Sequence, residues 1–174
     1  MESLQYPIGR FESVTELSEQ NRSNAIKRLE RFPSELKALC EKFAPADWSN
    51  SYRPQGWTAA QVVNHLADSH LHSYARFKHA ITEDTPTIKD YPEPLWAALF
   101  EAQSIESIPG SLMMIEGIHH RWVRFLNALH PEDFSRCFFH PETQTQHSLH
   151  QALAYYSWHC DHHLGHLKII KNMA

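Results

Sequence analysis

The chain has 174 residues, 42% of them hydrophobic and 21% charged, which fits one globular domain that we expect to span residues 1–174. No apolar run approaches the roughly 18 residues needed to cross a bilayer, the first ten residues lack the features of a signal peptide, and three widely spaced cysteines suit free thiols in a reducing compartment, so we expect a cytoplasmic protein without a membrane partner. The net charge of −4 and the lack of a long Lys/Arg run argue against a nucleic-acid partner.

The first half of the chain predicts an arm followed by two long helices. Residues 1–14 are expected to form an irregular N-terminal arm. Apolar residues then recur at helical spacing over about residues 15–43, where Pro33 should kink or split the helix. A Thr-x-x-Gln capping box opens a second helix over about residues 58–83.

The second half predicts a short helix over residues 93–103 and longer ones over 110–129 and 148–172, the last opened by a Ser-x-x-Gln capping box. Residues 136–140 are a short extended candidate between turns. No segment shows a convincing strand alternation. Long helices joined by loops of ordinary length therefore favour an all-α, up-and-down helical bundle.

The last helix carries two histidines on an otherwise apolar face. The chain has 14 histidines but only five glycines, so the positions of the imidazoles bear on function. The inward stripe is formed by Leu149, Leu153, Tyr156, His159, His163, Leu167 and Ile170. Two buried imidazoles need partners, and residues four apart on a helix can bind one metal ion.

Other interpretations of this helix stay open. A histidine-rich helix end can be a solvated face, and His162 and His166 have the same spacing as the first pair. We expect His162 and His166 to lie at the boundary of the core or to contact the ligands, and Cys160 is a weaker rival ligand. A third ligand should come from another helix. The second helix offers His65, His70, His72 and His79, of which periodicity alone favours His70.

Several motifs in order resemble a known family over nearly the whole chain. They are Tyr6-Pro7-Ile8-Gly9, Tyr52-Arg53, Trp57-Thr58, Val62-Val63, the run His65-Leu66-Ala67-Asp68-Ser69-His70, Ser73-Tyr74, Arg76-Phe77-Lys78, Glu83-Asp84-Thr85-Pro86 and the run Trp158-His159-Cys160-Asp161-His162-His163. This pattern resembles the DinB-like superfamily, and within it the YfiT branch of metal-dependent hydrolases. The resemblance implies an up-down-down-up four-helix bundle, one zinc or nickel ion per chain and a homodimer.

The resemblance also implies a ligand set. The family's first metal histidine falls on His65, and its paired histidines fall on His159 and His163. His70 then becomes a histidine at the edge of the core, hydrogen-bonded locally. One departure from the broader superfamily is His166, where many members carry Gln, and it lies outside the ligand set.

Three neutral imidazoles leave a coordination position open, as in catalytic metal sites. A metal-dependent hydrolase would activate water there for attack on a small-molecule substrate. Alternatively, the position could bind a low-molecular-weight thiol for transfer to electrophiles, as in several thiol S-transferases of the superfamily, or the protein could be a non-catalytic metal-binding stress protein. Asp68 and Asp161 are candidates for orienting an imidazole, and no residue stands out as a general base, so the catalytic residues stay unknown. The sequence does not choose between zinc and nickel.

Overall fold

A computed structural model describes residues 2–173 and contains four long helices. The helices are α1 Glu2–Gln5, α2 Glu19–Cys40, α3 Ala59–Thr82, α4 Glu93–Ala97, α5 Ile108–Ala128 and α6 Leu149–Asn172, with 3₁₀ turns η1 Pro45–Ser49, η2 Ile105–Ser107 and η3 Pro131–Ser135. Two strands, β1 Cys137–His140 and β2 Thr145–Ser148, complete the described elements. No helix among residues 2–173 is long and apolar enough to cross a membrane.

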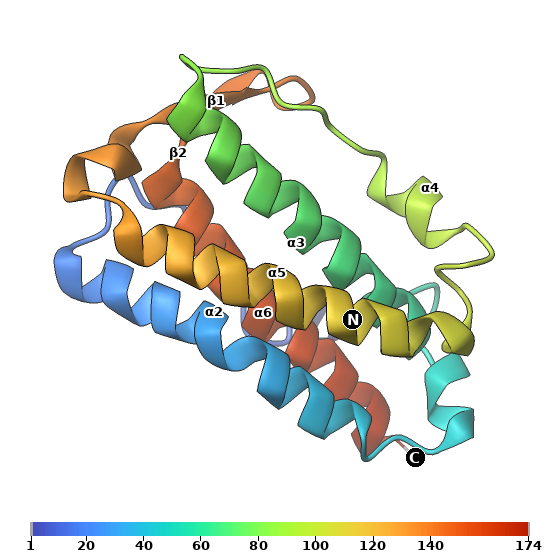
Figure 1. The fold of residues 1–174 in the computed structure, drawn as a ribbon. Helices are drawn as coiled ribbons and strands as arrows, with labels where there is room; N and C mark the ends of the chain where they lie inside the picture. Colours follow the sequence, from blue (N-terminus) through green and yellow to red (C-terminus); the bar gives the residue numbers. More distant parts are fainter. Residues whose placement is uncertain (1, 174) are drawn as a thin grey trace.

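The long helices form a four-helix bundle, which confirms the expected all-α fold. Figure 1 shows α2 and α6 running in one direction and α3 and α5 in the other, which is an up-down-down-up order. Helices α2 and α3 lie at opposite corners, and each packs against both α5 and α6. The pairing of α3 with α6 matters most for function, because these two helices carry most of the buried histidines.

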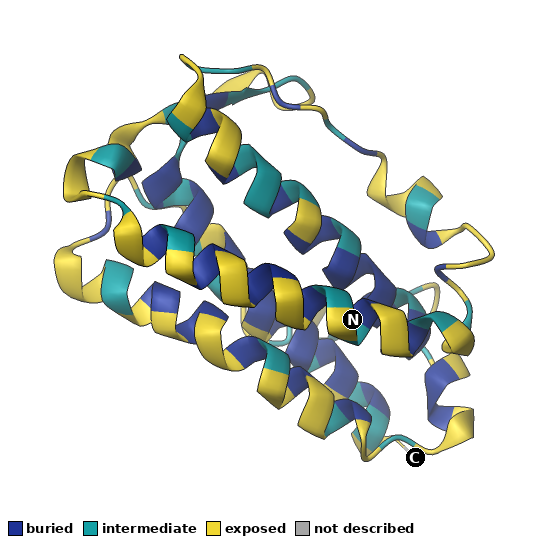
Figure 2. Cartoon of the chain, viewed as in Figure 1, coloured by how far each residue is buried: buried dark blue, intermediate teal, exposed yellow. Residues whose placement is uncertain are grey.

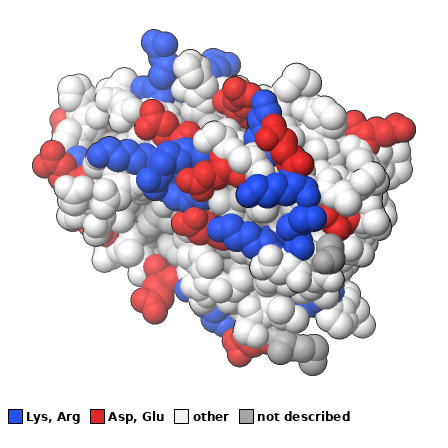
Figure 3. All heavy atoms as spheres, turned by 90° about the horizontal axis from the view of Figure 1, so that it is seen from below, with Lys and Arg blue, Asp and Glu red and all other residues white. Residues whose placement is uncertain are grey.

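The core lies between the inward faces of these four helices. Figure 2 shows buried residues along the inner face of each long helix and exposed residues along the outer face of α2 and α5. Large side chains that are almost completely buried include Phe32, Leu36, Leu66, Phe77, Ile115, Trp122, Leu153 and Leu167. Burying such side chains stabilises each one by about 1.5–3 kcal/mol relative to exposure. The outer surface mixes charges: on the face shown in Figure 3, Lys and Arg side chains lie next to Asp and Glu side chains.

Both predicted capping boxes are confirmed. The Thr58 hydroxyl accepts from the Gln61 N–H at 3.3 Å, and the Gln61 side chain accepts from the Thr58 N–H at 2.9 Å. Ser148 and Gln151 make the same pair of bonds at 3.2 and 2.9 Å. These bonds satisfy N–H groups that a helix start leaves free. They therefore fix the starts of α3 and α6.

The structure corrects the predicted N-terminal region. The arm is not wholly irregular, because α1 forms one helical turn within it. Helix α2 begins at Glu19 rather than at residue 15, because Ser18 caps it by accepting from the Asn21 N–H. Pro33 does not split α2: proline removes a single N–H, while Phe32 and Leu36 beside it stay fully buried in the core.

The extended segment predicted over residues 136–140 is confirmed as strand β1. Its pairing was not predicted: β1 pairs antiparallel with β2 from Cys137↔Ser148 to His140↔Thr145, in a hairpin although no segment shows a convincing strand alternation. The turn contains Gln144 at φ +54°, a left-handed conformation that the sequence gives no glycine or asparagine to announce. The short helix α4 also ends at Ala97, earlier than the predicted 103. The hairpin leads directly into the Ser148 cap of α6.

Candidate metal site

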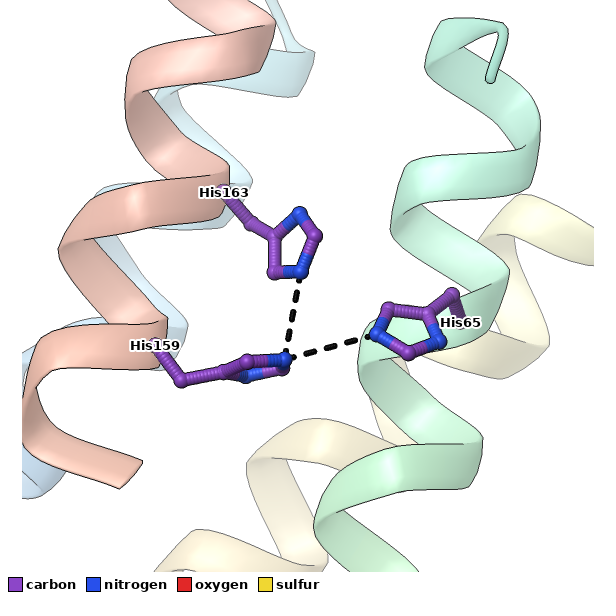
Figure 4. A group of neighbouring side chains, drawn as sticks. All are labelled: His65, His159 and His163. Carbon is purple, nitrogen blue, oxygen red and sulfur yellow. Dashed lines mark hydrogen bonds between the residues drawn. The ribbon is translucent and has the colours of Figure 1, made fainter. Parts of the chain in front are cut away.

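Helices α3 and α6 bring the three predicted ligands together. His65 projects from α3, and His159 and His163 project from successive turns of α6 toward it (Figure 4). The Nε2 atom of His159 lies 3.4 Å from Nε2 of His65 and 3.1 Å from Nε2 of His163. The three residues are only 4%, 4% and 6% exposed. Three imidazole nitrogens therefore meet at one nearly buried point.

The spacing of these nitrogens fits a single bound ion. Each of the three rings offers a nitrogen within 4.8 Å of the other two. Nitrogens at zinc-to-imidazole bond lengths of about 2.0–2.1 Å in a tetrahedral arrangement stand about 3.3 Å from one another. The observed separations of 3.1 and 3.4 Å match that value. The rings need little movement to hold a cation between them.

The three imidazoles are neutral at physiological pH. Burial, reinforced by neighbouring histidines, lowers the pKa of His65 to about 3. The same causes hold the pKa of His159 and His163 well below 6.5. Neutral imidazole is the form that binds metals, because protonation occupies the lone pair. A buried cluster of neutral rings thus has the chemistry of a metal site.

On the side away from the other two ligands, His163 is hydrogen-bonded to His166, which in turn is hydrogen-bonded to the N-terminal arm. The Nε2 atom of His166 lies 3.1 Å from the Gln5 carbonyl, which can only accept, so this nitrogen donates. The Nδ1 atom of His166 then accepts from Nδ1–H of His163 at 3.3 Å. This leaves the Nε2 lone pair of His163 facing the site. Tyr52 stacks on His166 with ring centroids 3.8 Å apart.

His162 and His166 are both more buried than a boundary position suggests. His166 is in contact with a predicted ligand, one of the two roles expected for it. His162 is also buried, and its ring stacks on Trp158 with centroids 4.4 Å apart. A second group of His162, His163 and His166 has nitrogens close enough for a metal, although it shares His163 with the first.

The prediction for His70 was wrong in two respects. His70 is completely buried, not at the edge of the core, and its bonds are not local. Its Nδ1 lies 2.6 Å from Nε2 of His119 on α5, and its Nε2 lies 3.1 Å from Nδ1 of His159. The inward stripe of α3 explains its burial, since Leu66 and Phe77 share that face. His119 was not anticipated, because nothing in its local sequence marks it as a partner of His70.

The remaining candidates do not join the cluster. Asp161 accepts from the Arg28 guanidinium at 2.8 Å, which ties α6 to α2 and leaves no role in orienting an imidazole. Within residues 2–173 no hydrogen bond links Asp68 to His65. Burial, and to a smaller extent the charge of Glu101, raises the pKa of Asp68 to about 6. Cys160 is fully buried, burial raises the pKa of its thiol, and it belongs to none of the metal-binding groups among the described residues.

Comparison with known proteins gives the family. Residues 28–167 match the model of the DinB superfamily. A Bacillus subtilis protein named "Putative metal-dependent hydrolase YfiT" is 39% identical over 165 residues, which cover 95% of this chain and 92% of that one. A Bacillus mycoides protein with the same functional name is 39% identical over 171 residues, covering 98% and 97%.

Structural comparison agrees over nearly the full length. A solved structure, described as "YfiT from Bacillus subtilis is a probable metal-dependent hydrolase with an unusual four-helix bundle topology", has a TM-score of 0.94 to this chain at 37% identity. The match covers 98% of this chain and 97% of that one. The motifs, the bundle and the family match point the same way: this chain belongs to the DinB superfamily and resembles its YfiT members from end to end.

Proposed function

We propose that this protein is a metal-dependent hydrolase that acts on a small-molecule substrate, with one zinc or nickel ion held by His65, His159 and His163. The observation that carries the proposal is the convergence of three buried, neutral imidazoles whose nitrogens are 3.1 and 3.4 Å apart. The hydrolase names of full-length relatives support the same reaction class.

The ligand set favours a catalytic over a structural site. When bound, a divalent ion with three protein ligands supplies Lewis-acid chemistry at an open position, including activation of water for attack on an electrophilic centre. The chain's own residues would bind the ion and orient the rings that hold it. His166 holds the ring of His163, and Trp57 packs against His65 with ring centroids 4.7 Å apart. This packing restricts the access of bulk water to His65.

The proposal also includes a homodimer in the cytoplasm. The family resemblance implies the dimer. Phe100 and Leu99 add support, because these large apolar side chains are 88% and 52% exposed and a second copy would cover such a surface. Light scattering on purified protein tests this part: a mass of about twice 20.3 kDa is expected, and a monomer at all concentrations would contradict it.

A turnover assay tests the hydrolase. Untagged protein is stripped of metal, reloaded with zinc or nickel, and offered a panel of activated esters and amides, alongside a thiol-conjugation assay with an electrophilic dye. We expect hydrolysis that depends on reloading and is lost in His163→Ala. His120→Ala, at an exposed histidine on α5, is the matched control and should retain activity. Full turnover by metal-free protein would refute the proposal, and conjugation without hydrolysis would replace it with thiol transfer.

A further inference from the structure

A proline inside α2 frees a carbonyl at the centre of the bundle. Pro33 has no N–H, so the Leu29 carbonyl four residues earlier lacks its helical partner. Leu29 is completely buried, and a buried carbonyl without a partner is costly. The Nδ1 atom of His119, on α5, lies 2.7 Å from this oxygen. The gap in the hydrogen bonds of α2 is therefore filled from another helix.

This carbonyl fixes the direction of every hydrogen bond in a chain of three imidazoles. A carbonyl only accepts, so Nδ1 of His119 carries the proton, and Nε2 of a neutral His119 has the lone pair. That lone pair accepts from Nδ1–H of His70 at 2.6 Å. Nε2 of His70 then accepts from Nδ1–H of His159 at 3.1 Å. Each bond sets the tautomer of the next ring.

This assignment of protons holds only if all three rings are neutral, and their buried surroundings keep them neutral. His119 is 1% exposed and His70 is completely buried between Phe32 and Trp122. Burial lowers the pKa of His119 to about 4, and burial also holds the pKa of His70 well below 6.5. With all rings neutral, the last member of the chain, His159, keeps its Nε2 lone pair for the side where His65 and His163 converge.

We propose that His119 and His70 are positioning residues that fix the tautomer and orientation of His159 and so set the metal affinity of the site. This inference rests on the proposed function, because it concerns the same ion. A partner on the second nitrogen of a metal-binding histidine orients the ring, and its loss lowers metal affinity about 10- to 100-fold. Here the partner is a second histidine, itself held by a third.

The first test measures tautomers in the metal-free wild-type chain. Long-range ¹H–¹⁵N NMR distinguishes Nδ1–H from Nε2–H imidazoles. We expect the Nδ1–H form at His119, His70 and His159. An Nε2–H form at any of the three would break the chain of bonds and overturn the inference. This test needs neither a variant nor a bound metal.

The second test measures zinc affinity by competition with a chromophoric chelator. In His119→Leu the donor to Leu29 and the acceptor for His70 both disappear, and we expect zinc binding to weaken about 10- to 100-fold. His119→Gln should recover most of this loss, since its amide can both donate to the carbonyl and accept from His70. His120→Leu, at the exposed neighbour, should bind like the wild type. Circular dichroism checks that each variant is folded.

The outcomes separate the two proposals. If the wild type binds zinc tightly and His119→Leu binds it equally tightly, the positioning role is wrong while the metal site stands. If the wild type binds neither zinc nor nickel, the site itself is wrong and the role in metal affinity falls with it. If His119→Leu does not fold, the tautomers of the wild-type chain decide the question.

Discussion

Acidification should destabilise the metal-free protein, and His119 should contribute a measurable share. Its pKa is about 4 in the folded chain, because burial disfavours the charged ring, against a value of 6.5 when exposed. The unfolded chain therefore binds more protons at His119 between these two values, so stability falls as the pH drops from 6.5 to about 4. At about 1.36 kcal/mol per pKa unit, the loss from this residue is about 3 kcal/mol.

Urea unfolding of metal-free protein between pH 8 and 4 measures this contribution. His119→Gln removes the titrating group while keeping a donor and an acceptor, so its free energy of unfolding should fall less steeply with acid. The slopes should differ by up to about 1.4 kcal/mol per pH unit between pH 6 and about 4.5. His120→Gln, at an exposed position, should follow the wild type. Superimposable curves for the wild type and His119→Gln would show that His119 does not contribute to the acid sensitivity of the fold.

Further substitutions test the surroundings of the site. At Gly165 an added Cβ would lie 2.7 Å from Cγ of Pro7, so Gly165→Ala should displace the N-terminal arm, seen as faster proteolysis there; unchanged proteolysis would contradict this contact. Its matched control is Gly117→Ala on α5, where an added Cβ meets nothing within 4 Å. This change should raise the free energy of unfolding by about 0.5–1 kcal/mol, as measured by thermal unfolding. Asp161→Asn should cost about 1 kcal/mol by weakening the bond to Arg28 and leave zinc content unchanged; loss of zinc would restore an orienting role for Asp161.

The sequence predicted the helices well because their local signals agree with the fold. The two capping boxes place the starts of α3 and α6 within one residue, and the apolar stripe of α6 identified both His159 and His163 as inward-facing. The hairpin was missed for a local reason: its turn relies on Gln144 in a left-handed conformation, which residue type does not announce.

The choice of the third ligand shows what helical periodicity cannot predict. Spacing on α3 favours His70, and the structure explains why: His70 does lie on the buried face. Its ring, however, contacts Nδ1 of His159, on the side away from the site, whereas the ring of His65 faces Nε2 of His159. Only the family resemblance chose His65. Periodicity tells which face of a helix is buried, and it does not tell at which level along the bundle the rings from two helices meet.

The chain of hydrogen-bonded histidines, His119, His70 and His159, could not be predicted from the sequence for the same reason. The sequence marked Pro33 as an interruption, but its consequence is a free carbonyl at Leu29 rather than a broken helix. The group that fills this gap, His119, is 90 residues away in the chain. No spacing rule links positions on three different helices, and only their packing brings them together.

Elemental analysis of untagged protein shows whether His65 and His163 bind the same metal ion. The wild type, His65→Ala, His163→Ala and the exposed control His120→Ala are compared, with circular dichroism as a check of folding. We expect about one zinc or nickel per chain in the wild type and the control, and loss of the metal from both ligand variants while their helical signal persists. A metal-free wild type, or metal retained by both ligand variants, would contradict this expectation.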